Sequence, residues 1–495
     1  MPDLYNYNPK MTHNEKLLHE LHKLHDGMLH AEATHLPVIE KVKEDYRNSA
    51  INLVDYLSLR ATDIETLQLQ LHRSGLSSLS SSEGHIKSQL IHVMEWLGAK
   101  PGDKCEVTPE NGLKYLQRNI EVLLGVKSTE NVIPVMVTFD TNFADDLDLL
   151  CALLENGMRL ARINCAHDSP DTWMAMISNL EQAKKKTGLP CKLYMDLAGP
   201  KIRTHIVDHK NQAIKLKVEE GDKIWLADPE ADHKKSKNLV RCTQSGIVEN
   251  LEPGQRVFFD DGLFEAVVLQ VEDKFARLRI ARIATKKPVI KNDKGINFPE
   301  TSYKIASITE YDKQCLPFIA KHADMVGYSF VNSAADMAEL QKELTQLNKP
   351  GFPIIAKIET RKAIDELPGI ILQGLSFGPT GVMVARGDMA IEIGFERMSE
   401  IQEEILWICE AAHTPVIWAT QVLENMQNEG IATRSEITDA THAAQADCVM
   451  INKGDYTIDV LEILKDILNR SRKNKFKNSR LFRSLSIAQH FIKES

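Results

Sequence analysis

The amino-acid sequence predicts an α/β fold: a TIM (β/α)8 barrel that carries an inserted small β-barrel lid domain and follows an N-terminal helical region. Three observations support this prediction. Residues 1–127 repeat apolar side chains at helical spacing, eight short apolar runs alternate with helical segments from Val132 onward, and a stretch rich in alternation and tight turns interrupts them at 204–297. We therefore expect a helical domain at 1–127, a barrel at 128–203 and 298–495, and a lid at 204–297.

The N-terminal region has the apolar periodicity of helices. One set consists of Leu17, Leu21, Leu24 and Met28, and a second consists of Leu53, Leu57, Ile64, Leu67 and Leu71, before a terminating Gly75. The serine-rich stretch 74–84 predicts a linker or an exposed loop.

Four histidines, His19, His22, His25 and His30, recur three and five residues apart in the first of these helices. A metal site is one interpretation of this spacing. We favour a hydrated helix face, because no carboxylate or cysteine partner is placed with them and short motif matches often mislead.

Eight apolar runs predict the strands of the barrel, and eight is the number that closes it. They span 132–139, 159–165, 191–197, 325–331, 353–359, 381–388, 415–421 and 448–454. Runs of this length, bounded by turn residues, are typical of strands buried on both faces of a parallel sheet. Each pair is separated by enough residues for the crossover helix that parallel strands require.

The gap between the third and fourth runs predicts a small antiparallel β domain, with hinges near Thr204 and Asn297. We expect Asp260 and Asp261, which precede Gly262, to form a turn rather than to bind a ligand. Such an insertion suits a lid that closes over the strand ends and excludes water.

Composition and charge narrow the function classes. With 43% apolar and 26% charged residues the chain resembles ordinary globular proteins, and a net charge of −9 argues against nucleic-acid or anionic-membrane partners. No run approaches the roughly 18 apolar residues of a membrane span, and the first residues lack the apolar core of a signal peptide. Eight scattered cysteines favour reduced thiols, so we expect a cytoplasmic location.

Charged and polar side chains stand where the apolar runs end, and this is where a β/α barrel carries its active site. They are Arg162, Asn164, Asp196, Lys201, Arg203, Lys357, Glu359, Asp388 and Thr420. Any one of these charges could belong to a structural ion pair, but the whole set at one end of the strands favours a binding site. Several cations beside carboxylates suit a multiply anionic ligand with Mg²⁺, and phosphate is the obvious candidate.

The sequence resembles the pyruvate kinase family in seven segments: LARINCAH, MDLAGPKIRT, KGINFP, IIAKIET, VMVARGDMAIEIG, VIWATQVLENM and ATRSEITDA. The similarity runs from about Val132 to Asn474. The helical N-terminal region resembles the extension of an atypical branch, in which MDLAGPK replaces the commoner DTKGPE. Because the chain stops at Ser495, we expect it to lack the family's C-terminal effector domain and to form any homo-oligomer through the barrel or the N-terminal helices.

The resemblance implies that the chain forms ATP and pyruvate from ADP and phosphoenolpyruvate. Lys357 would then stabilise the transferring phosphoryl group and the enolate oxygen, as a catalytic and substrate-binding residue. Glu359 and Asp388 would ligate Mg²⁺. The backbone groups of Gly387 and Asp388, together with Thr420, would hold the substrate carboxylate.

The resemblance also implies how the nucleotide and a proton are handled. Arg162 would contact the phosphates as a catalytic residue, and Arg203 with Lys294 of KGINFP would close on the nucleotide. A water-mediated relay near Thr420, with Thr438 where family members have serine, would protonate the enolate. The segment VTFDTNFADD lacks the small residue and proline usual on the adenine side, which leaves the base preference open.

One departure from the family pattern concerns K⁺. Asn164 and Asp196 of the usual monovalent-cation site remain, but Ala166 stands where a hydroxyl ligand would be and Lys201 replaces a glutamate. A tethered ammonium can supply the charge of a bound ion, so we expect activity without K⁺.

Two other functions remain open. A Mg²⁺-dependent lyase or aldolase acting on pyruvate or phosphoenolpyruvate also places Glu and Asp at strand ends, but it needs no nucleotide lid. A non-catalytic binding protein on the same fold would not need Lys357, Glu359, Asp388 and Thr420 intact.

Overall fold

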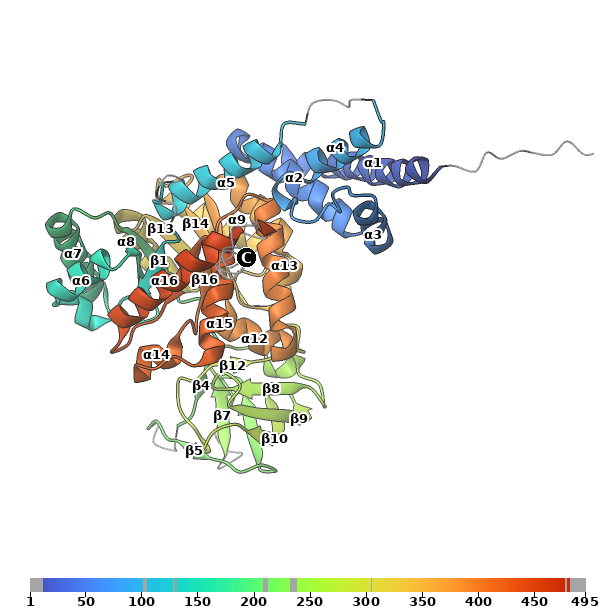
Figure 1. The fold of residues 1–495 in the computed structure, drawn as a ribbon. Coiled ribbons are helices and arrows are strands. Elements are labelled where there is room, and N and C mark those ends of the chain that lie inside the picture. Colours follow the sequence, from blue (N-terminus) through green and yellow to red (C-terminus); the bar gives the residue numbers. More distant parts are fainter. Residues whose placement is uncertain are drawn as a thin grey trace, which may run out of the picture.

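The central feature of the computed structural model is a closed barrel of eight parallel strands (Figure 1). The structure describes residues 12–100, 105–127, 130, 132–207, 212–231, 238–303, 305–476 and 479–480. The strands of the barrel are β1 (Val135–Thr138), β2 (Met158–Asn164), β3 (Lys192–Asp196), β13 (Met325–Tyr328), β14 (Ile354–Ile358), β15 (Thr380–Ala385), β16 (Val416–Ala419) and β17 (Cys448–Ile451). Each falls within or one residue outside a predicted apolar run, which confirms the predicted fold class.

One strand ends earlier than the sequence predicts. The run 381–388 leaves the sheet after Ala385, and Arg386 starts helix α12 (Arg386–Ile393). The side-chain oxygen of Thr420 accepts a hydrogen bond from the Gly387 amide in the first turn of α12. The first turn also contains Asp388, whose negative charge is favourable at a helix N-terminus. The segment Arg386–Asp388 is therefore helical because Thr420, at the neighbouring strand end, accepts a hydrogen bond from a backbone amide of its first turn.

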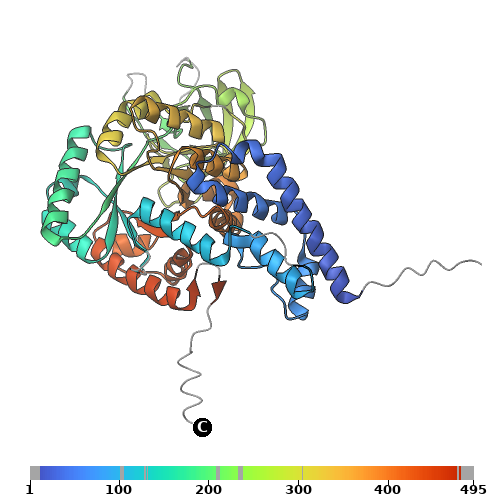
Figure 2. The ribbon, with the colours of Figure 1, turned by 90° about the horizontal axis from the view of Figure 1, so that it is seen from above.

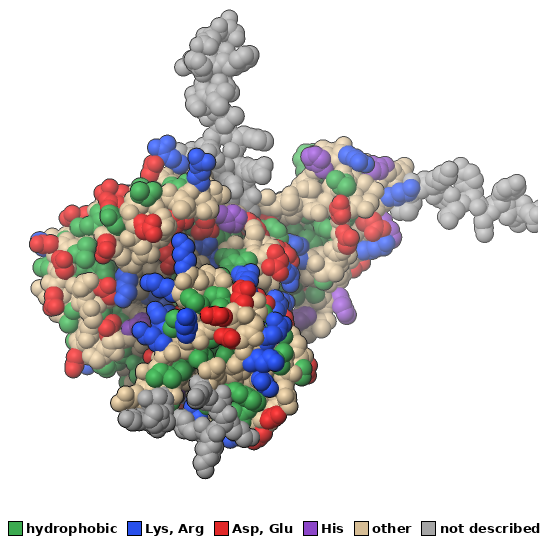
Figure 3. All heavy atoms as spheres, turned by 90° about the horizontal axis from the view of Figure 1, so that it is seen from below, with side chains coloured by type: hydrophobic (Ala, Val, Ile, Leu, Met, Phe, Trp, Pro, Cys, Tyr) green, Lys and Arg blue, Asp and Glu red, His purple; other side chains and the backbone are tan. Residues whose placement is uncertain are grey.

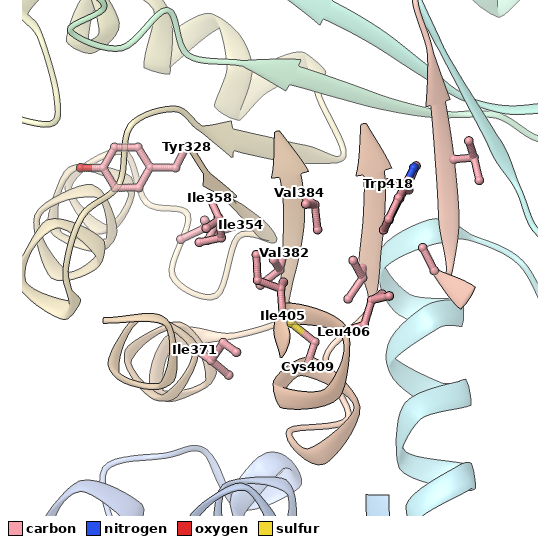
Figure 4. Close-up of a cluster of buried hydrophobic side chains, with 14 of the residues drawn as sticks. Tyr328, Ile354, Ile358, Ile371, Val382, Val384, Ile405, Leu406, Cys409 and Trp418 are labelled. Atoms are coloured by element: carbon pink, nitrogen blue, oxygen red, sulfur yellow. The ribbon is translucent and has the colours of Figure 1, made fainter. Parts of the chain in front are cut away.

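Helices surround the barrel and bury the outer faces of the strands. Side chains of β15 and β16, including Val382, Val384 and Trp418, point toward Ile371 of α11 and Ile405 of α13 (Figure 4). The helices of this layer are α6 (Leu147–Glu155), α7 (Pro170–Thr187), α8 (Glu310–His322), α9 (Ala334–Gln346), α10 (Arg361–Asp365), α11 (Leu367–Phe377), α12, α13 (Met398–Ala411), α14 (Glu424–Glu429), α15 (Arg434–His442) and α16 (Thr457–Asn474). A short pair, β18 (Lys475–Phe476) and β19 (Ser479–Arg480), follows α16.

The N-terminal helices lie against the end of the barrel opposite the lid (Figures 1 and 2). They are α1 (His13–Ile39), α2 (Glu44–Arg60), α3 (Glu65–Arg73), α4 (Ile86–Trp96) and α5 (Pro109–Leu124). Leu123 and Leu124 of α5 pack with the side chains that fill the barrel interior. The Asn52 amide bonds the carbonyls of Glu83 and Ala411 at 2.7 and 2.8 Å. The region is thus part of the same packed body as the barrel.

Two details of the N-terminal region refine the sequence analysis. The stretch 74–84 forms turns, but Leu79 and Glu83 are buried, so it is only partly exposed. His19, His22 and His30 are exposed on α1, and His22 Nδ1 lies 2.7 Å from the Leu18 carbonyl of its own helix. The part of the chain that the structure describes contains no group of three His, Cys, Asp or Glu side chains that could hold a metal ion.

The insertion forms a seven-stranded sheet with its own apolar core. Its order is β12 (Ile296–Asn297), β8 (Arg256–Phe259), β9 (Phe264–Glu272), β10 (Phe275–Ile283), β6 (Lys223–Ala227), β7 (Leu239–Cys242) and β4 (Thr204–His205), beside the small pair β5 (Leu216–Lys217) and β11 (Val289–Ile290). The sequence predicts an antiparallel domain, and most pairs are antiparallel, but β6 and β7 pair in parallel. An isolated antiparallel β-bridge pairs Arg203 with Gly295, so the segments that enter and leave the insertion lie side by side.

Asp260 and Asp261 both have positive φ angles, 53° and 52°, and form the predicted turn.

Among the described helices, none is long and apolar enough to cross a membrane.

Candidate active site

A cavity of about 170 Å³ opens at the carboxyl ends of the barrel strands, where the lid joins the barrel. Seen from the lid end, Lys and Arg side chains gather in the hollow between the lid and the barrel (Figure 3). The predicted residues that line the cavity are Arg162, Asn164, Lys201, Arg203, Lys357, Glu359, Gly387, Asp388 and Thr420. The fold therefore brings together residues from the ends of five barrel strands, β2, β3, β14, β15 and β16.

Lys357 lies at the centre of a buried network. Its ammonium donates to Ser329 Oγ at 2.7 Å and lies 3.1 Å from Glu359 Oε1 and 3.7 Å from Asp196 Oδ2. The other oxygen of Glu359 accepts a hydrogen bond from the Phe330 amide at 2.6 Å. Burial raises the pKa of Glu359, Lys357 opposes that rise, and the nearby charge of Asp388 adds to it. The site thus holds one cation between carboxylates in a water-poor setting.

Asp196 is fully buried and contacts two side chains that line the cavity, Arg162 and Lys357. It accepts hydrogen bonds from the Tyr194 hydroxyl and from Arg162 Nε, the latter at 2.7 Å. Burial would raise the pKa of Asp196, but the charges of Lys357 and Arg162 lower it. Arg162 also donates to Thr138 Oγ1 at 2.9 Å, so its guanidinium is fixed from two sides. Rigid cations of this kind can bind phosphate without reorganisation.

Lys201 pairs with Asp388 rather than with the rest of the predicted monovalent-cation set. Its ammonium lies 2.7 and 3.0 Å from the two oxygens of Asp388. Asn164 Oδ1 accepts a hydrogen bond from the Ala166 amide at 3.1 Å, and Asp196 is engaged by other cations. Within the described residues no ion pair joins Lys201 to Asp196. The fixed ammonium of Lys201 nevertheless lines the same cavity.

The β16 end holds an unusual backbone conformation. Thr420 and Gln421 have φ angles of 66° and 55°, a left-handed region that non-glycine residues rarely adopt. Arg386 holds this turn, because it donates to the carbonyls of Ala419 and Thr420 and packs over the Trp418 ring at 4.9 Å. Strained positions of this kind cluster at functional sites. Here the turn aims the Thr420 hydroxyl at the start of α12.

Three residues of the sequence interpretation lie outside the cavity lining: Asp196, which is buried behind Arg162 and Lys357, and also Lys294 and Thr438. Lys294 pairs with Asp260 in the lid at 2.8 Å, and Thr438 donates to the Arg434 carbonyl at 3.1 Å on an exposed face of α15. Arg203 lines the cavity and donates to the Asp293 carbonyl at 3.0 Å. The two cations predicted to close on a nucleotide therefore lie apart, Arg203 in the cavity lining and Lys294 in an ion pair with Asp260.

Sequence reasoning missed Ser329 and Tyr194, which bond Lys357 and Asp196. Ser329 directly follows β13 and so occupies the same kind of strand-end position as the predicted residues. Tyr194 sits two residues before Asp196 and shares its face of β3, a period-two relation that could have revealed it.

The residues fit a magnesium ion. Glu359 and Asp388 both line the cavity, and the charge of Asp388 contributes to the raised pKa of Glu359. Mg²⁺ is usually bound by one or two carboxylates, while substrate oxygens and water complete its octahedron. Two carboxylates that line one cavity match this requirement, and in this structure Glu359 contacts the Lys357 ammonium and Asp388 contacts the Lys201 ammonium.

Comparison with known proteins is consistent with this geometry. The family model described as pyruvate kinase, barrel domain, matches residues 133–459. The chain belongs to the pyruvate kinase family. Among curated relatives, the pyruvate kinases of Bacillus licheniformis and Geobacillus stearothermophilus are each 31% identical over 66% of this chain and 55% of their own length. That of Borreliella burgdorferi is 30% identical over 69% of both chains.

The chain spans about half the length of the first two of these pyruvate kinases. The family match includes the barrel and the inserted sheet but begins after α5. The role of the N-terminal helices must therefore be argued from the structure itself.

Proposed function

We propose that this chain is an active pyruvate kinase, which transfers a phosphoryl group from phosphoenolpyruvate to ADP and yields pyruvate and ATP. The observation that carries the proposal is the buried position of Lys357 between Glu359, Asp196 and Ser329. Phosphoryl transfer requires mainly positioning and neutralisation of charge, and a fixed ammonium at the reacting group supplies both. The family match does not favour the lyase or the non-catalytic alternative.

The substrate would bind through groups that the network leaves pointing into the cavity. The Thr420 hydroxyl accepts from the Gly387 amide, so its own proton is available for the carboxylate of phosphoenolpyruvate. Lys357 would stabilise the phosphoryl oxygens and then the enolate oxygen as the P–O bond breaks. Glu359 and Asp388 would hold Mg²⁺, which neutralises charge on the substrate when bound. Water near Thr420 would deliver the proton that converts the enolate to pyruvate.

The nucleotide would bind between the barrel and the lid. Arg162 would contact the transferring phosphate, and Arg203 would approach it from the hinge. Lys294 lies beyond the cavity lining and pairs with Asp260, so closure of the lid would have to bring it to the nucleotide. Thr438 takes part in the proton relay only if water extends from Thr420 to α15.

We also propose that turnover does not require K⁺, because Lys201 supplies a fixed positive charge beside Asp388. A cytoplasmic enzyme with no nucleic-acid partner is consistent with the acidic composition. Any homo-oligomer would use the barrel or the N-terminal helices.

A coupled assay of pyruvate release tests the proposal. The wild type, Lys357→Ala and the exposed-lysine control Lys342→Ala are compared with phosphoenolpyruvate, ADP and Mg²⁺, with and without K⁺. We expect ADP-dependent turnover without K⁺, a loss of at least about 10³-fold in Lys357→Ala, and no change in the control. Folded wild type that is inactive with every nucleoside diphosphate would contradict the proposal, and an absolute K⁺ requirement would contradict the role of Lys201.

A further inference from the structure

A second cavity lies between the N-terminal helices α1 and α2 and the barrel helices α9 and α11. Its volume is about 580 Å³, larger than that of the candidate active site. Its walls are apolar, with contributions from Val38, Val54, Leu57 and Leu372. Cavities that bind small molecules have this character: apolar walls with few polar groups.

The cavity exists because the facing positions carry small side chains. Ala31 of α1, Ser58 of α2, Ala334 of α9 and Gly369 of α11 all line it. The helices approach each other closely at these same positions: a Cβ on Gly369 would lie 3.9 Å from Ala334 Cβ, and one on Gly27 would lie 3.5 Å from Ser58 Oγ. The space is therefore a groove between helices held at fixed spacing, open to solvent where His35, Val38 and Lys41 are exposed.

The charge at the rim is basic. Of the residues that line the cavity, His35 and Lys41 are the two that can carry charge. Both are exposed, and within the described part of the chain no carboxylate lies within ion-pair distance of Lys41. His35 Nδ1 lies 2.9 Å from the Ala31 carbonyl, which orients its ring toward the backbone of α1 on one side. An anionic group at this rim would meet the Lys41 ammonium, which forms no ion pair with a described carboxylate.

We propose that this cavity binds a free aliphatic carboxylate, with its hydrocarbon chain between α2 and α11 and its carboxylate at Lys41. The apolar walls favour a chain because each buried methylene removes apolar surface from water. The basic rim favours a carboxylate over a neutral or cationic head, because the opposite charges attract and remain partly hydrated. The site lies outside the matched family region on its α1 and α2 side.

Calorimetric titration of the full chain with octanoate, decanoate and dodecanoate below their micelle concentrations tests this proposal. Each added methylene is expected to lower the Kd about fourfold, which corresponds to ~0.8 kcal/mol per buried methylene. Dodecylammonium, with the same chain and the opposite charge, is expected to bind more weakly. Equal Kd values for octanoate and dodecanoate, or equal binding of the ammonium, would overturn the proposal.

Two variants locate the ligand. Ala31→Leu fills the cavity from α1 and keeps a good helix former, so dodecanoate affinity is expected to fall at least tenfold. Ala175→Leu on α7 is the matched control and is expected to bind as the wild type does. Lys41→Met is expected to weaken dodecanoate about threefold, as for an exposed ion pair, and it tests the site even if Ala31→Leu does not fold. Unchanged dodecanoate binding in both folded variants would overturn the proposed position.

Discussion

Glu392 is a buried acid at the junction of the barrel and the lid, and its substitution should stabilise the protein in a pH-dependent way. It lies on α12, is 9% exposed, and accepts a hydrogen bond from Asn297 Nδ2 at 3.1 Å. Asn297 belongs to β12, the last strand of the insertion, and its Oδ1 is buried without a hydrogen-bond partner among the described residues. Burial raises the pKa of Glu392 from 4.5 to about 7.

The raised pKa of Glu392 determines how the free energy of unfolding depends on pH. Because the folded-state pKa lies above the unfolded value, the ionised form is disfavoured in the folded state, and stability falls as pH rises from 4.5 to 7. A shift from 4.5 to about 7 is 2.5 units, which costs about 3.4 kcal/mol above pH 7 at 1.36 kcal/mol per unit. At pH 5 the same relation leaves a cost of about 0.8 kcal/mol. Glu392→Gln removes this cost, and its amide can donate to Asn297 Oδ1.

Urea unfolding of the wild type and Glu392→Gln at pH 5 and pH 8.5 measures the effect. The gain of the variant in free energy of unfolding should be about 2.5 kcal/mol larger at pH 8.5 than at pH 5. Glu429→Gln, at an exposed helix end, serves as the control and should show no pH-dependent gain. A gain that is equal at both pH values would refute the argument, since it would mean that the Glu392 carboxyl does not titrate in this range.

Three further substitutions test the site and its support. Lys201→Met leaves Asp388 without its cation, so steady-state turnover without K⁺ should fall at least about tenfold and recover in part when K⁺ is added; equal loss at all K⁺ concentrations would contradict this. Gly327→Ala would place a Cβ 1.9 Å from Tyr194 Oη, so thermal unfolding should show a loss of about 3 kcal/mol or an insoluble protein. Asn52→Ala removes the hydrogen bonds from Asn52 to the Glu83 and Ala411 carbonyls, so the free energy of unfolding should fall by about 3 kcal/mol. Limited proteolysis should then cut the N-terminal helices faster, and a variant as resistant as the wild type would argue against Asn52 as an anchor of these helices.

The barrel could be predicted from the sequence because its strands are buried on both faces. Such strands appear as continuous apolar runs, and the pattern survives without knowledge of tertiary contacts. The end of β15 could not be predicted in this way. Arg386 and Gly387 turn into a helix because Thr420, a residue of the next strand end, accepts the Gly387 hydrogen bond. The sequence alone does not show that Thr420 lies beside Gly387 in the folded chain.

The sequence predicts which residues lie in the candidate site, but it does not predict which carboxylate pairs with which cation. Strand-end positions identify Lys201, Asp388 and Asp196 as neighbours, since all strands of a parallel barrel end at one rim. Which carboxylate meets which cation depends on side-chain rotamers and on the direction in which the chain leaves each strand. Lys201 therefore pairs with Asp388 across the cavity instead of joining Asn164 and Asp196 near β2 and β3. The fully buried Asp196 already has Arg162, and a further buried charge there would need another partner.

The second cavity also bears on the candidate active site, because the two barrel helices that line it follow loops of that site, α9 at once and α11 after the short helix α10. Ala334 begins α9 just after the loop of Ser329 and Phe330, and α11 follows the segment that starts with Glu359. A hydrogen bond between Thr360 and Asn332 ties these two loops together, and the Phe330 amide binds Glu359 directly. Since packed helices shift as rigid units, any change in the spacing of α9 and α11 must be absorbed at these bonds. The small residues that line the cavity, Ala334 of α9 and Gly369 of α11, therefore lie on helices whose preceding loops are bonded to Glu359, a proposed magnesium ligand, and to each other.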